Sequence, residues 1–281
     1  MVPVSTLLAC GFTLMVSMAL PVALLIVMNL KWKNDKILTA WLLGAAGFFV
    51  TQILIRLPIL TVLQTQSWFV SFSQKTPFVY AFSLAFTAGL FELVGRFVVA
   101  KLMAKNLSFR RSLAAGLGHG GIEAIVLIGM TYVNNLIYIV MINTGTFDTL
   151  VAEASAAVSG SQLDLLLAQL DMIKTQLISS PSSLFLLAAL ERILTICCHA
   201  AMSLIVCYGV ASGKTLPSLL ICLGIHTLLD LTAGISLLIG TALTQATAYL
   251  IIYLILAVAA GISLMIIRKL CRNWPQKEAT L

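Results

Sequence analysis

Long apolar stretches separated by short polar segments recur along the whole chain. A helix of about 20 apolar residues, rising about 1.5 Å per residue, is long enough to cross a hydrocarbon core of roughly 30 Å. We therefore predict an all-α, polytopic transmembrane helical bundle of about seven spans. The predicted spans are Val4–Leu30, Ile37–Leu63, Pro77–Ala100, Leu113–Ile142, Ser183–Val210, Leu216–Ile239 and Thr244–Ile267.

The composition excludes an ordinary soluble domain, because 60% of the residues are hydrophobic and only 10% are charged. The first span has no Lys or Arg before it and is too long for the apolar region of a signal peptide. We expect this span to be retained and the mature chain to begin at or close to Met1. Residues 1–281 are expected to form a single integral membrane domain. We expect it to lie in a cell membrane, specifically the cytoplasmic membrane of a bacterium.

The basic residues of the loops are unevenly distributed, and such residues are held on the cytoplasmic side of a membrane. Only Lys75 and Lys174 fall on one side, so we predict the N-terminus outside and the C-terminus in the cytoplasm. Topology thus explains the net charge of +7, and we expect the lipid bilayer, and no nucleic acid, as a partner. The basic residues assigned to the cytoplasmic side are Lys31, Lys33, Lys36, Lys101, Lys105, Arg110, Arg111, Lys214, Arg268, Lys269, Arg272 and Lys277.

One long segment, residues 143–182, lies between two spans and carries more acidic than basic residues. Its leucines and isoleucines recur at helical spacing between Leu163 and Leu177, which predicts an amphipathic helix on the outer surface. The segment is either a simple connector or a lid over a site, and the pattern does not choose between them.

Ionisable residues inside the spans are the first candidates for function, because a charged side chain in the hydrocarbon core costs roughly 2.5 to 3.5 kcal/mol on insertion scales. Several of them form pairs spaced i,i+4, which places both side chains on one face of a helix. An imidazole one turn from a carboxylate can fix a tautomer, ligate a metal or relay a proton. The pairs are Glu92 with Arg96, His119 with Glu123, and His226 with Asp230.

These residues fall at a similar depth when helix rise is counted from the nearest cytoplasmic basic residue. Glu92, Glu123 and the histidines come out roughly 12 to 23 Å inside, near the midplane. We therefore expect them, including His199 of the fifth span, to converge. Glu191 and Arg192 fall nearer the outer face, so we interpret them as structural partners.

The segment from Gly116 to Glu123 has an unusual number of glycines for the start of a span. Small residues spaced four apart, such as Gly116 and Gly120, allow helices to approach closely. Alternatively, glycine brings backbone N–H groups close to a substrate carbonyl or to a water beside His119. Both explanations remain open from the sequence.

Four segments in this order resemble the YhfC family of intramembrane proteases, and more distantly the PrsW and CAAX-protease (ABI) families. They are the Phe91-Glu92-Leu-Val-Gly-Arg96 segment, the Gly118-His119-Gly120-Gly121-Ile122-Glu123-Ala124 segment, Glu191-Arg192 through His199, and His226-Thr-Leu-Leu-Asp230. The resemblance covers most of the chain. It implies a peptidase that cleaves a membrane protein or peptide through water activated by a glutamate.

The resemblance also implies roles for the paired residues. CAAX proteases carry two adjacent glutamates in the first segment, whereas Phe91 precedes Glu92 here, so Glu123 is our first candidate for the general base and Glu92 the second. Arg96 would hold Glu92, and His199 and His226, the latter held by Asp230, would stabilise the oxyanion or orient the base. A metal-dependent form would use the three histidines, His119, His199 and His226, as zinc ligands, with Glu123 as a further ligand or as the base. HxxxE is not, however, the HExxH spacing of zinc-protease helices.

Two other classes of protein fit the same residues. Paired histidines and carboxylates near the midplane also build the relay of a proton- or ion-coupled transporter. A non-catalytic membrane partner or immunity protein would retain the polar network for packing alone. The sequence shows no inverted repeat of the kind common in transporters, which favours the peptidase.

Overall fold

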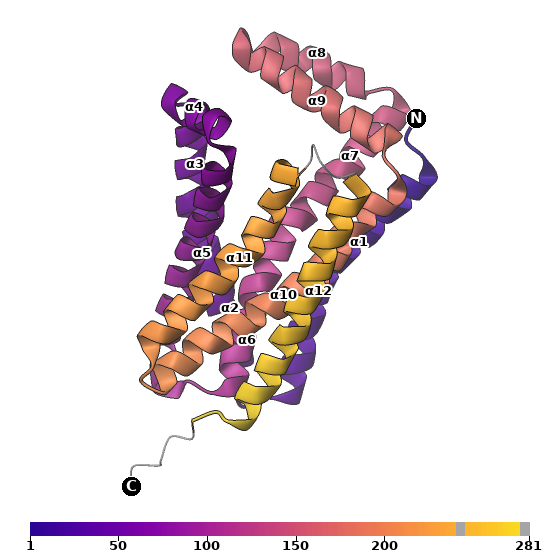
Figure 1. Ribbon diagram of the computed structural model, residues 1–281. Helices are drawn as coiled ribbons and strands as arrows, with labels where there is room; N and C mark the ends of the chain where they lie inside the picture. The colour runs from indigo at the N-terminus through magenta and orange to yellow at the C-terminus, as the bar shows by residue number, and fades with distance from the viewer. Residues whose placement is uncertain (240–244, 276–281) are drawn as a thin grey trace. The chain divides into compact units, whose positions relative to one another are not determined.

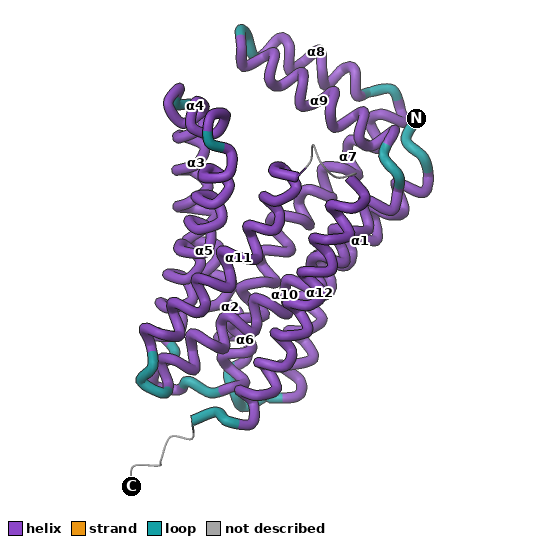
Figure 2. The backbone as a smooth tube through the Cα atoms, in the orientation of Figure 1, coloured by secondary structure: helices purple, strands orange, loops and turns teal. Residues whose placement is uncertain are grey.

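A computed structural model describes residues 1–239 and 245–275 of the chain, and within these ranges the regular structure is helical throughout, with no strand (Figure 2). The predicted start of the seventh span at Thr244, and Lys277 of the predicted cytoplasmic side, lie outside the described residues.

The described part of the chain contains 7 helical segments that are long and apolar enough to cross a membrane, which confirms the predicted number. The protein is a multi-pass membrane protein, and its helices can be followed in Figure 1. The spans are α1 (Val4–Lys31), α2 to α3 (Ile37–Gln64), α5 (Pro77–Leu102), α6 to α7 (Phe109–Thr144), α10 (Ser182–Ala211), α11 (Thr215–Ile239) and α12 (Gln245–Arg272).

Two of the spans change their helical geometry midway. In the second span, α2 (Ile37–Phe48) passes into a π-helix, η1 (Phe49–Arg56), before α3 (Leu57–Gln64). In the fourth, α6 (Phe109–Glu123) passes into η3 (Ala124–Gly129) before α7 (Met130–Thr144). π-Helical turns are rare and frequently occur at functional sites, and the hydrophobic pattern did not predict them.

The segment between the fourth and fifth spans folds into two helices, α8 (Phe147–Ala157) and α9 (Ser161–Ser179). The predicted amphipathic helix corresponds to α9, whereas α8 was not predicted. Lys174 Nζ of α9 donates to Asp148 Oδ1 of α8 at 2.9 Å. A further short helix, α4 (Ser67–Lys75), and a 3₁₀ turn, η2 (Ala104–Asn106), connect other spans. That residues 143–182 are external stays a prediction, and both explanations of the segment, a connector or a lid, stay open.

Residues 1–20 and 124–192 form one compact unit, and residues 21–123 and 193–281, as far as they are described, form another. The core of the first unit includes Cys10, Ile139 and Leu177. Phe185 anchors it through its carbonyl oxygen, which accepts hydrogen bonds from the hydroxyls of Thr13 and Tyr132 at 2.8 Å each.

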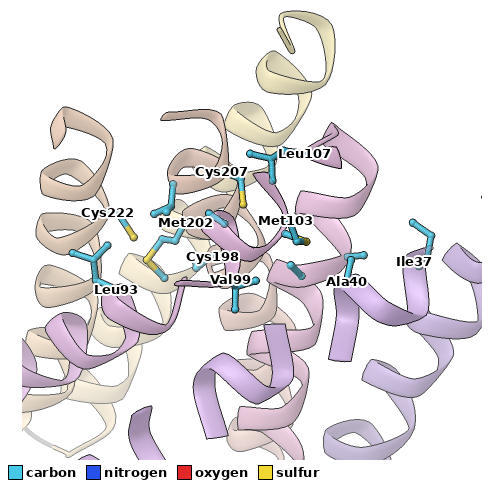
Figure 3. Packing of buried hydrophobic residues seen from close by; sticks show 14 of the residues in the cluster. Ile37, Ala40, Leu93, Val99, Met103, Leu107, Cys198, Met202, Cys207 and Cys222 are labelled. Carbon is cyan, nitrogen blue, oxygen red and sulfur yellow. The ribbon is translucent and has the colours of Figure 1, made fainter. Parts of the chain in front are cut away.

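In the second unit, apolar side chains from α2, α5, α6, α10 and α11 pack into a continuous core. Figure 3 shows part of this core, which is rich in small and sulfur-containing side chains. It includes Ala40, Leu93, Val99, Met103, Cys198, Met202, Cys207 and Cys222. Several of these residues neighbour the polar candidates in sequence, so the core fixes the helices that carry the site.

Glycines let the helices of the second unit approach closely. A Cβ at Gly118 would overlap the backbone carbonyl of Trp41 on α2, and a Cβ at Gly44 would overlap that of Ala115 on α6. A Cβ at Gly120 would lie 2.8 Å from the Cβ of His199 on α10. The glycine-rich start of the fourth span is therefore explained by helix packing, the first of the two explanations considered above.

Candidate functional site

The candidate site is centred on Glu92 of α5, whose side chain is only 6% exposed. Arg96 Nη2, one turn further along α5, donates to Oε2 of Glu92 at 3.0 Å. Two histidines from other helices contact the same oxygen: Nε2 of His119 lies 3.0 Å from it and Nε2 of His226 lies 2.8 Å from it. The structure thus brings together one glutamate, one arginine and two histidines from α5, α6 and α11.

A third histidine, His199 of α10, also contacts this group. Its Nδ1 lies 2.6 Å from Nη2 of Arg96 and 3.7 Å from Oε2 of Glu92. Because a guanidinium can only donate, Nδ1 must accept, so the ring proton of neutral His199 is on Nε2. That atom lies 2.8 Å from Oε2 of Glu123, which completes the predicted convergence.

The remaining predicted pair lies at the edge of this group. Asp230 Oδ2 is 3.4 Å from Nδ1 of His226, and its side chain is 39% exposed. His226 therefore has a carboxylate near each ring nitrogen, Asp230 at Nδ1 and Glu92 at Nε2. A carboxylate beside the second nitrogen is the arrangement that orients metal-binding histidines.

The second span contributes two residues that the sequence analysis did not assign to the site. Gln52 and Arg56 lie in the π-helix η1. Gln52 Nε2 donates to Oε1 of Glu92 at 3.0 Å, and Arg56 Nη1 donates to Oε1 of Gln52 at 3.2 Å. A polar pair spaced i,i+4 in an otherwise apolar span was the signal that could have found them.

One group of described residues has the geometry to hold a metal ion. Glu92, His199 and His226 are all buried, and each offers a ligand atom within 4.8 Å of the others. Nitrogen and carboxylate oxygen donors in a buried site suit a transition metal such as zinc. The sequence-based ligand set had His119 in place of Glu92. In the structure Nε2 of His119 lies against Glu92 instead.

The two candidate bases differ in their surroundings. Oε2 of Glu92 has contacts with Arg96 and two histidines, and its Oε1 accepts from Gln52. Glu123 is the more exposed of the two carboxylates, at 12% against 6%. That Glu123 is the general base, with Glu92 as the second candidate, stays a prediction.

Glu191 and Arg192 are adjacent ionisable residues of α10. They form an ion pair with each other within the first compact unit, whereas all of the residues above belong to the second. Their interpretation as structural partners stays a prediction.

The helical spans and the buried cluster define a multi-pass membrane protein with a histidine and carboxylate site within its spans. The chain belongs to the YhfC intramembrane metalloprotease family, whose model matches residues 16–259. It is 29% identical over 219 residues to the uncharacterized membrane protein YhfC of Bacillus subtilis (strain 168). The matched region covers 78% of this chain and 80% of that relative. No solved structure gives a significant match.

Proposed function

We propose that the protein is an intramembrane peptidase that hydrolyses a peptide bond of a membrane protein or membrane-associated peptide, with Glu123 as the general base. The observation that carries this proposal is the convergence of Glu92, Glu123 and three histidines inside the spans. Burying such groups is costly in lipid, so a function is the expected reason for them. The description of the matching family supports the same activity.

In this mechanism Glu123 accepts a proton from the attacking water and returns it to the leaving amine. His199 bridges the base and the centre of the site, because it contacts Glu123 through Nε2 and Arg96 through Nδ1. Arg96 and His119 hold the carboxylate of Glu92 in place. Asp230 orients His226 toward Glu92.

We further propose that the activity is metal-assisted, with zinc held by Glu92, His199 and His226, in which case His199 would exchange one of its present contacts for the ion. The donor set supports this form, and so does the description of the family as metalloproteases. When bound, zinc would polarise the substrate carbonyl and lower the pKa of water. A purely glutamic mechanism would use the same Glu123 without the ion.

A second candidate function is proton- or ion-coupled transport, and one observation favours it. Carboxylates and imidazoles alternate through the site, from Asp230 by way of His226, Glu92 and His199 to Glu123. Successive contacts along this series are between 2.8 and 3.7 Å. Such a series has the composition of a proton relay.

The test is reconstitution of the purified full-length protein into liposomes with a panel of single-span membrane proteins as substrates. Cleavage is followed by mass spectrometry for the wild type and for Glu123→Gln, Glu92→Gln and His226→Ala. Glu153→Gln, which makes the same chemical change at an exposed position of α8, is the matched control. Each protein is assayed with and without a chelator, and its bound metal is measured.

We expect cleavage by the wild type and the Glu153→Gln control, and loss of cleavage in the other three variants. Cleavage that survives all three substitutions would overturn the catalytic assignment. Chelator-resistant cleavage by a protein without bound metal would leave the glutamic mechanism alone. Proton flux across the liposome membrane without any cleavage would favour the transporter.

A further inference from the structure

The two oxygens of the Glu92 carboxylate contact different neighbours. Oε2 faces the histidines and Arg96, at distances between 2.8 and 3.7 Å. Oε1 instead accepts a hydrogen bond of 3.0 Å from Nε2 of Gln52, which comes from the second span. Gln52 is itself buried, at 4% exposure, so water cannot readily replace this donor.

The orientation of the Gln52 amide is determined by its other contacts. Nε2 also donates to the carbonyl oxygen of Ala88 at 3.1 Å, so both neighbours of that nitrogen are acceptors. Oε1 of Gln52 faces Nη1 of Arg56, which can only donate. A flipped amide would place an acceptor against acceptors and a donor against a donor. Gln52 therefore presents its N–H groups to Glu92.

Arg56 is in turn fixed to the helix that carries Glu92. Its Nη2 donates to the carbonyl oxygen of Leu84 on α5 at 2.8 Å. The hydrogen-bond series thus leaves α5 at Leu84, passes through Arg56 and Gln52 on η1, and returns to α5 at Glu92. This closed series holds the π-helical turn against α5 and leaves the carboxylate little freedom to rotate.

We propose that Gln52, fixed by Arg56, is a positioning residue that engages Oε1 of Glu92 and so keeps Oε2 turned toward His199 and His226, where it would act as the metal ligand. This inference rests on the metal-assisted form of the proposed function. A carboxylate held in this way would bind a metal through one oxygen, and a coordination position would then stay available to water or substrate. Partners of this kind typically change metal affinity by about 10- to 100-fold when they are removed.

The experiment measures zinc affinity by competition with a chromogenic chelator, using the purified full-length protein in detergent. Gln52→Met removes the donor to Glu92 with little change in side-chain length. Arg56→Met keeps Gln52 but removes the hydrogen bond that holds its amide in place. Thr51→Val is the matched control, because Thr51 is a buried neighbour on the same π-helix whose hydroxyl donates to Gly47, away from Glu92. Visible spectra of the Co²⁺-substituted proteins report the ligand geometry, and thermal stability with chelator reports folding.

We expect about 10- to 100-fold weaker zinc binding and an altered Co²⁺ spectrum for Gln52→Met. Arg56→Met should show a smaller change of the same kind, and Thr51→Val should match the wild type. If Gln52→Met does not fold, Arg56→Met carries the test by the same measurements.

Wild-type affinity and spectrum in the folded Gln52 and Arg56 variants would overturn the positioning role while leaving the proposed peptidase intact. A wild-type protein that cleaves substrate but binds no zinc would overturn this inference together with the metal-assisted mechanism. The two failures are therefore distinguishable.

Discussion

The ion pair between Glu92 and Arg96 gives the most direct physical test of the site. The two side chains are 6% and 1% exposed. Nη2 of Arg96 contacts Glu92 and His199, whereas Nε and Nη1 have no hydrogen-bond partner among the described residues. Glu92→Gln removes the negative charge that lies against this guanidinium. The buried cation of Arg96 is then left without its anionic partner.

Breaking a buried ion pair by removing one partner typically costs about 3 to 5 kcal/mol, because the remaining charge is no longer compensated. We expect Glu92→Gln to lower the free energy of unfolding by this amount. Arg96→Met should cost a similar amount, since it leaves the buried carboxylate without its guanidinium partner. The double variant should cost less than the sum, and contacting residues usually show an interaction energy of about 0.5 to 3 kcal/mol.

The assay is denaturant-induced unfolding of the full-length protein in mixed micelles, followed by the fluorescence of its 4 tryptophans. A chelator is present throughout, so that loss of metal does not contribute. Glu153→Gln controls for the same chemical change at an exposed position. This prediction is refuted if the free energy of unfolding of Glu92→Gln lies within about 1 kcal/mol of the wild-type value and the effects of Glu92→Gln and Arg96→Met are additive. Glu92 and Arg96 would then not form a buried ion pair, and the described geometry would be wrong.

Three further predictions concern catalysis, packing and topology. Glu123→Gln should lower the cleavage rate by about 10²- to 10⁴-fold in steady-state assays while bound zinc stays unchanged; a parallel loss of zinc would make Glu123 a ligand instead of the base. Gly118→Ala should cost about 1 to 3 kcal/mol in the same unfolding assay, because its Cβ would overlap the carbonyl of Trp41, whereas Gly224→Ala, with nothing within 4 Å, should not destabilise. Alkaline phosphatase fused at the C-terminus should be inactive and fused within residues 143–182 should be active; the reverse result would invert the predicted orientation.

The number of spans could be predicted from the sequence because the membrane leaves few alternatives. Backbone groups in lipid must be satisfied within a helix, so a long apolar run predicts a helix without knowledge of its neighbours. The same restriction made the buried ionisable residues conspicuous. Glu92, Glu123, His119, His199 and His226 were identified in this way, and helix rise alone predicted that they lie at one depth.

The contacts between these residues depend on tertiary structure. His119 and Glu123 share a helix face at i,i+4, yet His119 contacts Glu92 of α5 and Glu123 contacts His199 of α10. Spacing along one helix predicts a common face but does not determine which neighbouring helix packs against it. The glycines of α6 determine that packing, since Gly120 leaves the space that the side chain of His199 occupies.

The sequence alone thus determined the spans and the approximate depth of the candidate residues within them. Each span must satisfy its own backbone hydrogen bonds, and ionisable residues are rare in such apolar segments. The identity of the central residue was decided only by tertiary structure. Glu92 receives Gln52 from a π-helical turn that the hydrophobic pattern did not predict, and histidines from three other helices. These contacts join residues far apart in the chain, so they exist only where the helices have packed.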